Sequence, residues 1–147
     1  MNDKNLEAGA IGRFGYVSDY DPKGHMARII FPDKGNLVSS WLPVLVPNSK
    51  ENHDELHLDV NEHVFCLMLG NGLEAGAVIG AIYDNKNNPP EGVQNIRKIT
   101  FQDGTEILYD RKNHELKINC VGNITIHAEG NLKISAGRIN MKEGSKA

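Results

Sequence analysis

The sequence contains two near copies of one eight-residue segment, GNITIHAE at residues 122–129 and GNLKISAG at residues 130–137. Each copy opens with glycine, and apolar residues then alternate with polar ones. Alternation gives a β-strand one apolar and one polar face. A fixed short period is typical of repetitive β structure. The two copies therefore predict extended chain that turns at each repeat.

The same alternation runs through residues 97–142, in short runs separated by turns such as 103–105. A lone thin ribbon leaves part of its apolar face in water, and a two-stranded ribbon is marginally stable. We therefore expect three copies to wind around a common axis and pair their open edges. The residues expected on that axis, called the axial row below, are Leu116, Ile118, Cys120, Ile124, Ile126, Leu132, Ile134, Ile139 and Met141. The alternative, in which 97–142 extend a β-sandwich as hairpins, explains the alternation but not the eight-residue copy.

The first part of the chain predicts a small barrel. Short apolar runs bounded by Gly, Pro, Asn and Asp indicate strands. The expected strands are residues 11–18, 26–31, 40–46, 60–69 and 77–83. Strands joined by short turns, without a crossover helix, favour a closed barrel of the OB type. The expected fold class is therefore all-β, with an OB-fold barrel before the repetitive segment.

A polar stretch that contains Pro89 and Pro90 separates these two patterns. Such a composition is typical of a linker. The predicted organisation is an N-terminal tail at 1–9, a barrel at 10–88, a linker at 89–96, the trimeric segment at 97–142 and a C-terminal tail at 143–147.

Composition limits the kinds of partner that the protein is expected to bind and the compartment in which it is expected to be made. The net charge is −3 and no basic run is present, which argues against a nucleic-acid partner. The polar, acidic start and the lack of a long apolar stretch predict synthesis in the cytoplasm without export by the general route. Cys66 and Cys120 lie far apart in apolar runs, so we expect two buried thiols and no disulfide framework.

No motif predicts an enzyme, a cofactor or a metal site. The segment His53-Asp54-Glu55-Leu56-His57 does not have the His-Glu-x-x-His order of a metalloprotease. Asp19, Asp21 and Asp33 occupy expected turns, where aspartate bonds the backbone. The sequence also contains no nucleophile elbow and no P-loop.

Several segments together resemble the phage baseplate assembly protein V family. They are IGRFGYV at 11–17, ARIIFPD at 27–33, SWLPV at 40–44, EHVFCL at 62–67, GAIY at 80–83, and FQDGT at 101–105 running to Tyr109-Asp110. The resemblance lies in their order and spacing and covers about residues 10–142. Members of this family form the central spikes of contractile phage tails, R-type bacteriocins and related injection machines.

The resemblance implies an OB-fold barrel followed by an intertwined triple-stranded β-helix. It also implies a homotrimer at the baseplate centre, beneath the tail tube, in contact with the hub and tube proteins. Sheath contraction would drive this spike through the envelope of the target cell. The protein would thus be a structural part of a phage tail or tail-like particle and not an enzyme.

One departure from the family concerns the tip. Several members end in a His-x-His motif that holds an iron ion, and this sequence has none. His127 lies between two expected inward positions, so we expect it to face outward. We therefore predict no tip metal. Ile139 and Met141 would plug the end, or a separate protein similar to the PAAR-repeat tips would cap it, because a blunt apolar end needs cover.

Two other functions compete with the spike. An OB-fold module for oligosaccharide or oligonucleotide would use rings such as Tyr16, Tyr20 and Trp41, but few basic residues accompany them. A cell-wall hydrolase is the third reading. Larger spikes carry a lysozyme domain as an insertion, and this chain has no room for one.

Overall fold

The computed structural model describes residues 12–70, 72–90 and 92–144. Within these ranges the protein is all-β, with antiparallel sheets and no α-helix, which confirms the predicted class. The described residues include no helix that is long and apolar enough to cross a membrane. The predicted tail at 1–9, the strand start at Ile11, part of the tail at 143–147 and the turn residue Asn71 lie outside the described residues.

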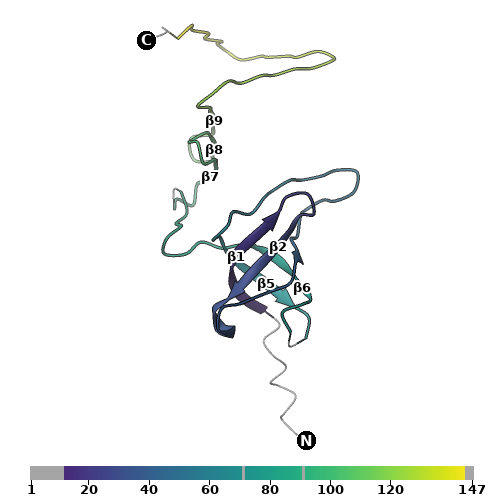
Figure 1. Ribbon diagram of the computed structural model, residues 1–147. Coiled ribbons are helices and arrows are strands. Elements are labelled where there is room, and N and C mark those ends of the chain that lie inside the picture. Colours follow the sequence, from purple (N-terminus) through teal and green to yellow (C-terminus); the bar gives the residue numbers. More distant parts are fainter. Residues whose placement is uncertain (1–11, 71, 91, 145–147) are drawn as a thin grey trace, which may run out of the picture. The chain divides into compact units, whose positions relative to one another are not determined.

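The chain divides into two compact units, Met1–Pro89 and Pro90–Ala147. Unit 1 contains one sheet with the order β3-β2-β1-β5-β6, and β4 also pairs with β2 (Figure 1). Its strands are β1 (Gly12–Asp21), β2 (Met26–Phe31), β3 (Leu37–Val38), β4 (Leu42–Pro43), β5 (His63–Met68) and β6 (Gly76–Ala81). A single-turn 3₁₀ helix, η2 (Pro32–Lys34), follows β2.

The two ends of this sheet meet just after β4. Val44 forms a parallel bridge with Val78 of β6, and the amide of Leu45 donates to the Val78 carbonyl at 2.9 Å. Because β4 pairs with β2 on its other side, the sheet curls back onto itself. The alternate side chains that point inward are thereby removed from water.

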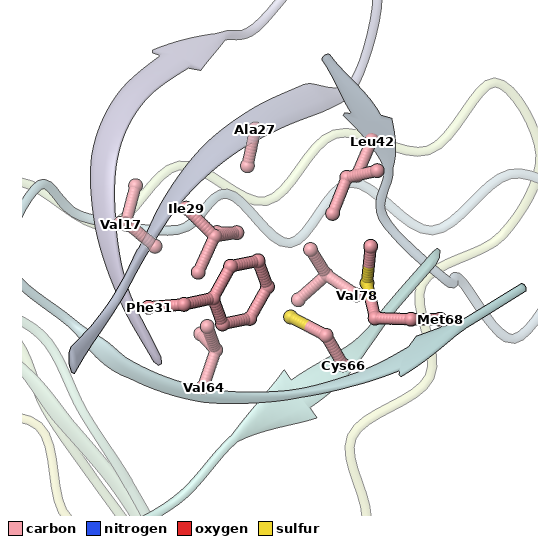
Figure 2. Close-up of a cluster of buried hydrophobic side chains, with 9 residues drawn as sticks. All are labelled: Val17, Ala27, Ile29, Phe31, Leu42, Val64, Cys66, Met68 and Val78. Carbon is pink, nitrogen blue, oxygen red and sulfur yellow. The ribbon is translucent and has the colours of Figure 1, made fainter. Parts of the chain in front are cut away.

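Nine apolar residues form the core of unit 1, and their side chains converge between the strands (Figure 2). They are Val17, Ala27, Ile29, Phe31, Leu42, Val64, Cys66, Met68 and Val78. Alternate positions of β2 and β5 supply most of them, as the period of two requires. Burial of this set drives the folding of unit 1.

The predicted strand 26–31 is confirmed by β2, whereas the predicted strand 40–46 is confirmed only in part, by β4 and the bridge at Val44. The chain forms two short strands, β3 and β4, with the buried Ser39 between them. The hydroxyl of Ser39 accepts the Ile29 amide hydrogen at 2.9 Å, and the Ser39 amide donates to the Ile29 carbonyl at 2.8 Å. A side-chain oxygen therefore replaces one backbone partner and interrupts the strand.

Unit 2 contains a three-stranded antiparallel sheet of β7 (Ile96–Thr100), β8 (Glu106–Asp110) and β9 (Glu115–Asn119). The predicted turn at 103–105 is confirmed, and a second turn follows β8 at residues 111–114. In the first, Gly104 has φ +91° and the Asp103 carboxylate accepts the Thr105 amide at 2.8 Å. After β9 the described residues 120–144 include no further strand (Figure 1).

These three strands pair within one chain and form a sheet of their own. They do not join the sheet of unit 1 by hydrogen bonds, and they form ordinary antiparallel hairpins, as the β-sandwich alternative expected for this part of the chain. The division between the units falls between Pro89 and Pro90.

Candidate interaction surface

The β7–β9 sheet has one strongly apolar face. Residues that pair directly across antiparallel strands point to the same side. Ile107 pairs with both Ile99 and Ile118, and Tyr109 pairs with Leu116. These five residues are called the apolar face below. Two of them, Leu116 and Ile118, belong to the axial row, and the other three come before the axial row in the sequence.

The opposite face of this sheet is polar but better covered. Lys98 and Glu106 form an ion pair at 2.6 Å, and their side chains are only 11% and 29% exposed. Leu108 on the same face is half-buried, whereas every residue of the apolar face is exposed. A half-solvated sheet normally shows the reverse arrangement. The apolar face is therefore the side of the sheet that needs a partner.

The axial row continues this exposed surface along the chain. Leu116 and Ile118 lie in β9, and Cys120 follows it half-buried. The other six lie in the described stretch without strands. Excluding Cys120, the side chains of the row are exposed by between 51% at Ile139 and 88% at Met141. The single chain brings Leu116 and Ile118 onto one face and leaves the later members in solvent.

The backbone beyond Asn123 also lacks partners. Among the described residues, no backbone-to-backbone hydrogen bond involves 124–144. Backbone amides and carbonyls need hydrogen-bond partners, and extended chain finds them in neighbouring strands or in water. A segment with an alternating pattern, exposed apolar side chains and free backbone groups has the properties of a strand whose neighbours are supplied by other chains.

Titratable groups offer little chemistry on either unit. The described residues include no group of three or more His, Cys, Asp or Glu that could hold a metal ion. The amides of Lys86 and Asn87 lower the pKa of Asp84, and the amide of Asn113 lowers the pKa of Asp110. Both carboxylates accept backbone hydrogen bonds in turns, which is a role in local structure.

The three predicted turn aspartates also serve the fold. Asp33 pairs with the buried Arg13. Asp21 accepts the amide of Lys23 at 3.1 Å, at the turn after β1. Asp19 was expected in a turn, but it lies within β1, which continues as far as Asp21. The turn prediction is therefore wrong at Asp19.

The rings proposed for the competing binding module have separate surroundings. Tyr16 stacks on His63 with centroids 4.7 Å apart. The Arg28 guanidinium lies 5.9 Å from the Trp41 ring centre. Tyr20 belongs to a third cluster. These three rings do not form one row with each other, but Tyr16 continues through His63 and Phe14 to Phe65 in a row of four neighbouring rings.

That third cluster was not predicted. The Tyr20 hydroxyl lies 2.8 Å from Nδ1 of His25 and 2.9 Å from Nδ1 of His57. Burial and the nearby carboxylates of Asp21 and Glu55 raise the pKa of Tyr20. His57 thus contacts a neighbouring phenol, and the sequence carried no signal for this because His57 lies 37 residues from Tyr20 along the chain.

A cavity of about 850 Å³ lies beside Tyr16 and His63. The charged residues that line it are Asp59, Glu62, Asp84 and Lys86. Three carboxylates and one ammonium group disfavour a polyanion there. Comparison with known proteins finds neither a family model nor a curated protein that matches this chain.

Proposed function

We propose that this chain is the central spike of a contractile phage tail or tail-like particle, acting as a homotrimer. The observation that carries the proposal is the uncovered apolar surface of unit 2, formed by the apolar face and the axial row. Exposed apolar surface of this extent marks an interaction site. The order of the segments that resemble the baseplate assembly protein V family supports the assignment to a spike.

In the proposed trimer, three copies of the β7–β9 sheet pack their apolar faces around one axis. Because strands 96–119 already pair within each chain, winding between chains begins after Asn119. From there to residue 142, the extended segments pair their edges with one another. Each copy then buries its axial row and satisfies its free backbone groups in one step.

Unit 1 would form the broad end of the spike as an OB-fold barrel. The parallel bridge between Val44 and Val78 supports this reading, because it joins the two ends of the curled sheet. The meander of β1, β2 and the β3–β4 segment, followed by the hairpin of β5 and β6, agrees with a small five-stranded barrel in which β3 and β4 count as one interrupted strand. The hub and tail-tube proteins would seat on these barrels.

Such a trimer suits puncture. Axial load is shared among three chains and many parallel hydrogen bonds, and unfolding one chain requires its separation from the other two. Unfolding is then slow, which is the property a device used once under force needs. The end of the needle would be closed by Ile139 and Met141 or by a separate PAAR-like tip protein.

Light scattering on the purified chain tests the trimer directly. The expected mass is three times 16.2 kDa, with an elongated particle in electron micrographs. Antibodies against the chain should then label the centre of the baseplate in particles from the source organism. A monomer at micromolar concentration would overturn the proposal.

The competing OB-fold binding module makes a different prediction. It requires saturable binding of an oligonucleotide or oligosaccharide, reported by a change in Trp41 or tyrosine fluorescence. A trimer that binds neither ligand and leaves cell wall intact excludes both alternatives.

A further inference from the structure

Unit 1 carries an apolar surface of its own on the outside of its sheet. Phe14, Tyr16, His63, Phe65 and Leu67 alternate with the core residues of β1 and β5 and therefore point outward. Ile79 of β6 lies at a register shift between β5 and β6 and is also exposed. We call these six residues the outer aromatic face. Phe14 is 56% exposed, and none of the six is Asp, Glu, Lys or Arg.

The rings of this face are packed against one another. Phe14 and Phe65 pair across β1 and β5, with ring centroids 5.1 Å apart. The Phe65 ring also lies over Gly12, where an added Cβ would fall 2.5 Å from the ring. The glycine thus lets the ring lie flat along the strand. The face therefore carries an aromatic ridge in which Tyr16, His63, Phe14 and Phe65 follow one another.

Interface centres are rich in aromatic residues and poor in charged ones, which is the composition of this face. We propose that the occupant of the outer aromatic face is unit 1 of a second copy of this chain. This inference rests on the proposed trimer. Around a threefold axis each copy contacts its two neighbours through different parts of its surface.

The connection between unit 1 and β7 is short, so three copies of unit 1 in the proposed trimer stay close to one another. Residues 90–95 join unit 1 to β7 and span about 20 Å when fully extended. A unit of about 80 residues has a radius of gyration of about 12 Å. Three such units tied to one axis by so short a connection meet at millimolar effective concentration or higher.

None of the six residues of the face is Asp, Glu, Lys or Arg, but the carboxylates of Asp59, Glu62 and Asp84 line the cavity beside Tyr16 and His63. Copies of unit 1 would therefore meet over the apolar residues and leave these carboxylates in water.

Thiol labelling of the full chain tests the inference. Cys120 stays in place because it belongs to the axial row, and labelling of the parent chain gives its contribution as the background. The buried Cys66 has its pKa raised to about 12 and does not react at neutral pH. Single cysteines are then placed on the face, as Ile79→Cys and Leu67→Cys, and off it, as Leu56→Cys. In the isolated chain the three parent side chains are 41%, 43% and 68% exposed.

The solution contains only this protein, so any protection of the face must come from the same molecule or from another copy of it. We expect the face thiols to react at least about tenfold more slowly than the thiol of L56C, because the label reaches them only when the contact opens. Light scattering on the same samples should give a trimer.

The outcomes separate the two proposals. Fast labelling of I79C and L67C in a trimer overturns the inference and leaves the spike intact. Slow labelling in a monomer means that the chain covers its own face, which overturns both. Fast labelling in a monomer likewise contradicts both, because the trimer itself is missing.

Discussion

Ile126 lies on the axial row, and its side chain is 68% exposed in the single chain. The Ile126→Asp variant would place three carboxylates on the proposed axis, where burial of unpaired charge is costly. We expect loss of the trimer with unit 1 still folded, seen as a fall in mass by light scattering and an unchanged melting transition for unit 1.

The matched control for this variant is Thr125→Asp, one residue earlier on the alternate face. It should remain a trimer, because its carboxylate stays in water. Trimers of equal stability in both variants would contradict the assignment of Ile126 to the axis.

Cys66 allows a second residue-level prediction. Burial raises the pKa of its thiol to about 12, from an ordinary value of 9.0. The unfolded chain loses this proton near pH 9 and the folded chain keeps it, so the stabilisation is complete below pH 9 and declines towards pH 12. The midpoint of urea unfolding should fall between pH 9 and pH 11. The Cys66→Ala variant should be less stable at neutral pH but show a shallower decline. Parallel pH profiles would refute this account.

At the scale of single elements, β1 depends on a glycine for its packing against β2. An added Cβ at Gly15 would lie 2.4 Å from Cγ2 of Ile29 and 2.6 Å from the Ile30 carbonyl oxygen. Gly15→Ala should therefore destabilise unit 1 by about 1–3 kcal/mol, the usual cost of overpacking. Urea unfolding followed by circular dichroism measures the change.

Gly80 provides the control in the same sheet, because nothing lies within 4 Å of its hypothetical Cβ. Gly80→Ala should be neutral or slightly stabilising, since alanine restricts the unfolded chain. If both substitutions cost the same, the close approach of β1 and β2 does not explain the first.

How well each element could be predicted depends on where its hydrogen bonds come from. The β2 strand was predicted correctly because its alternation and flanking turns are local signals. The third strand was predicted only in part. No sequence pattern indicated that Leu37 and Val38 also pair with β2, or that Ser39, whose hydroxyl accepts the Ile29 amide hydrogen, separates them from β4. Likewise β1 extends to Asp21 because its last residues pair with β2, which overrides the turn preference of aspartate.

On the scale of the whole molecule, stability should depend on concentration. A trimer that unfolds to monomers is stabilised by mass action, so its melting temperature should rise with protein concentration. A chain that ends at Asn95 keeps the core of unit 1 but loses the apolar face and the axial row. We expect its melting temperature to be independent of concentration. The same result for the full chain would argue against association.

Periodicity and turn residues act locally, so the amino-acid sequence alone was enough to predict an all-β protein and the positions of most core strands. It was also enough to show that the last third of the chain alternates in a short repeat. The tertiary structure decided how the curled sheet closes at Val44 and Val78, which strands of unit 2 pair within the chain, and which faces remain uncovered. These depend on contacts between residues distant along the chain, and no local pattern encodes them. The exposure of a side chain is known only when all of its neighbours have been placed. This exposure identifies the surfaces where other copies are proposed to bind.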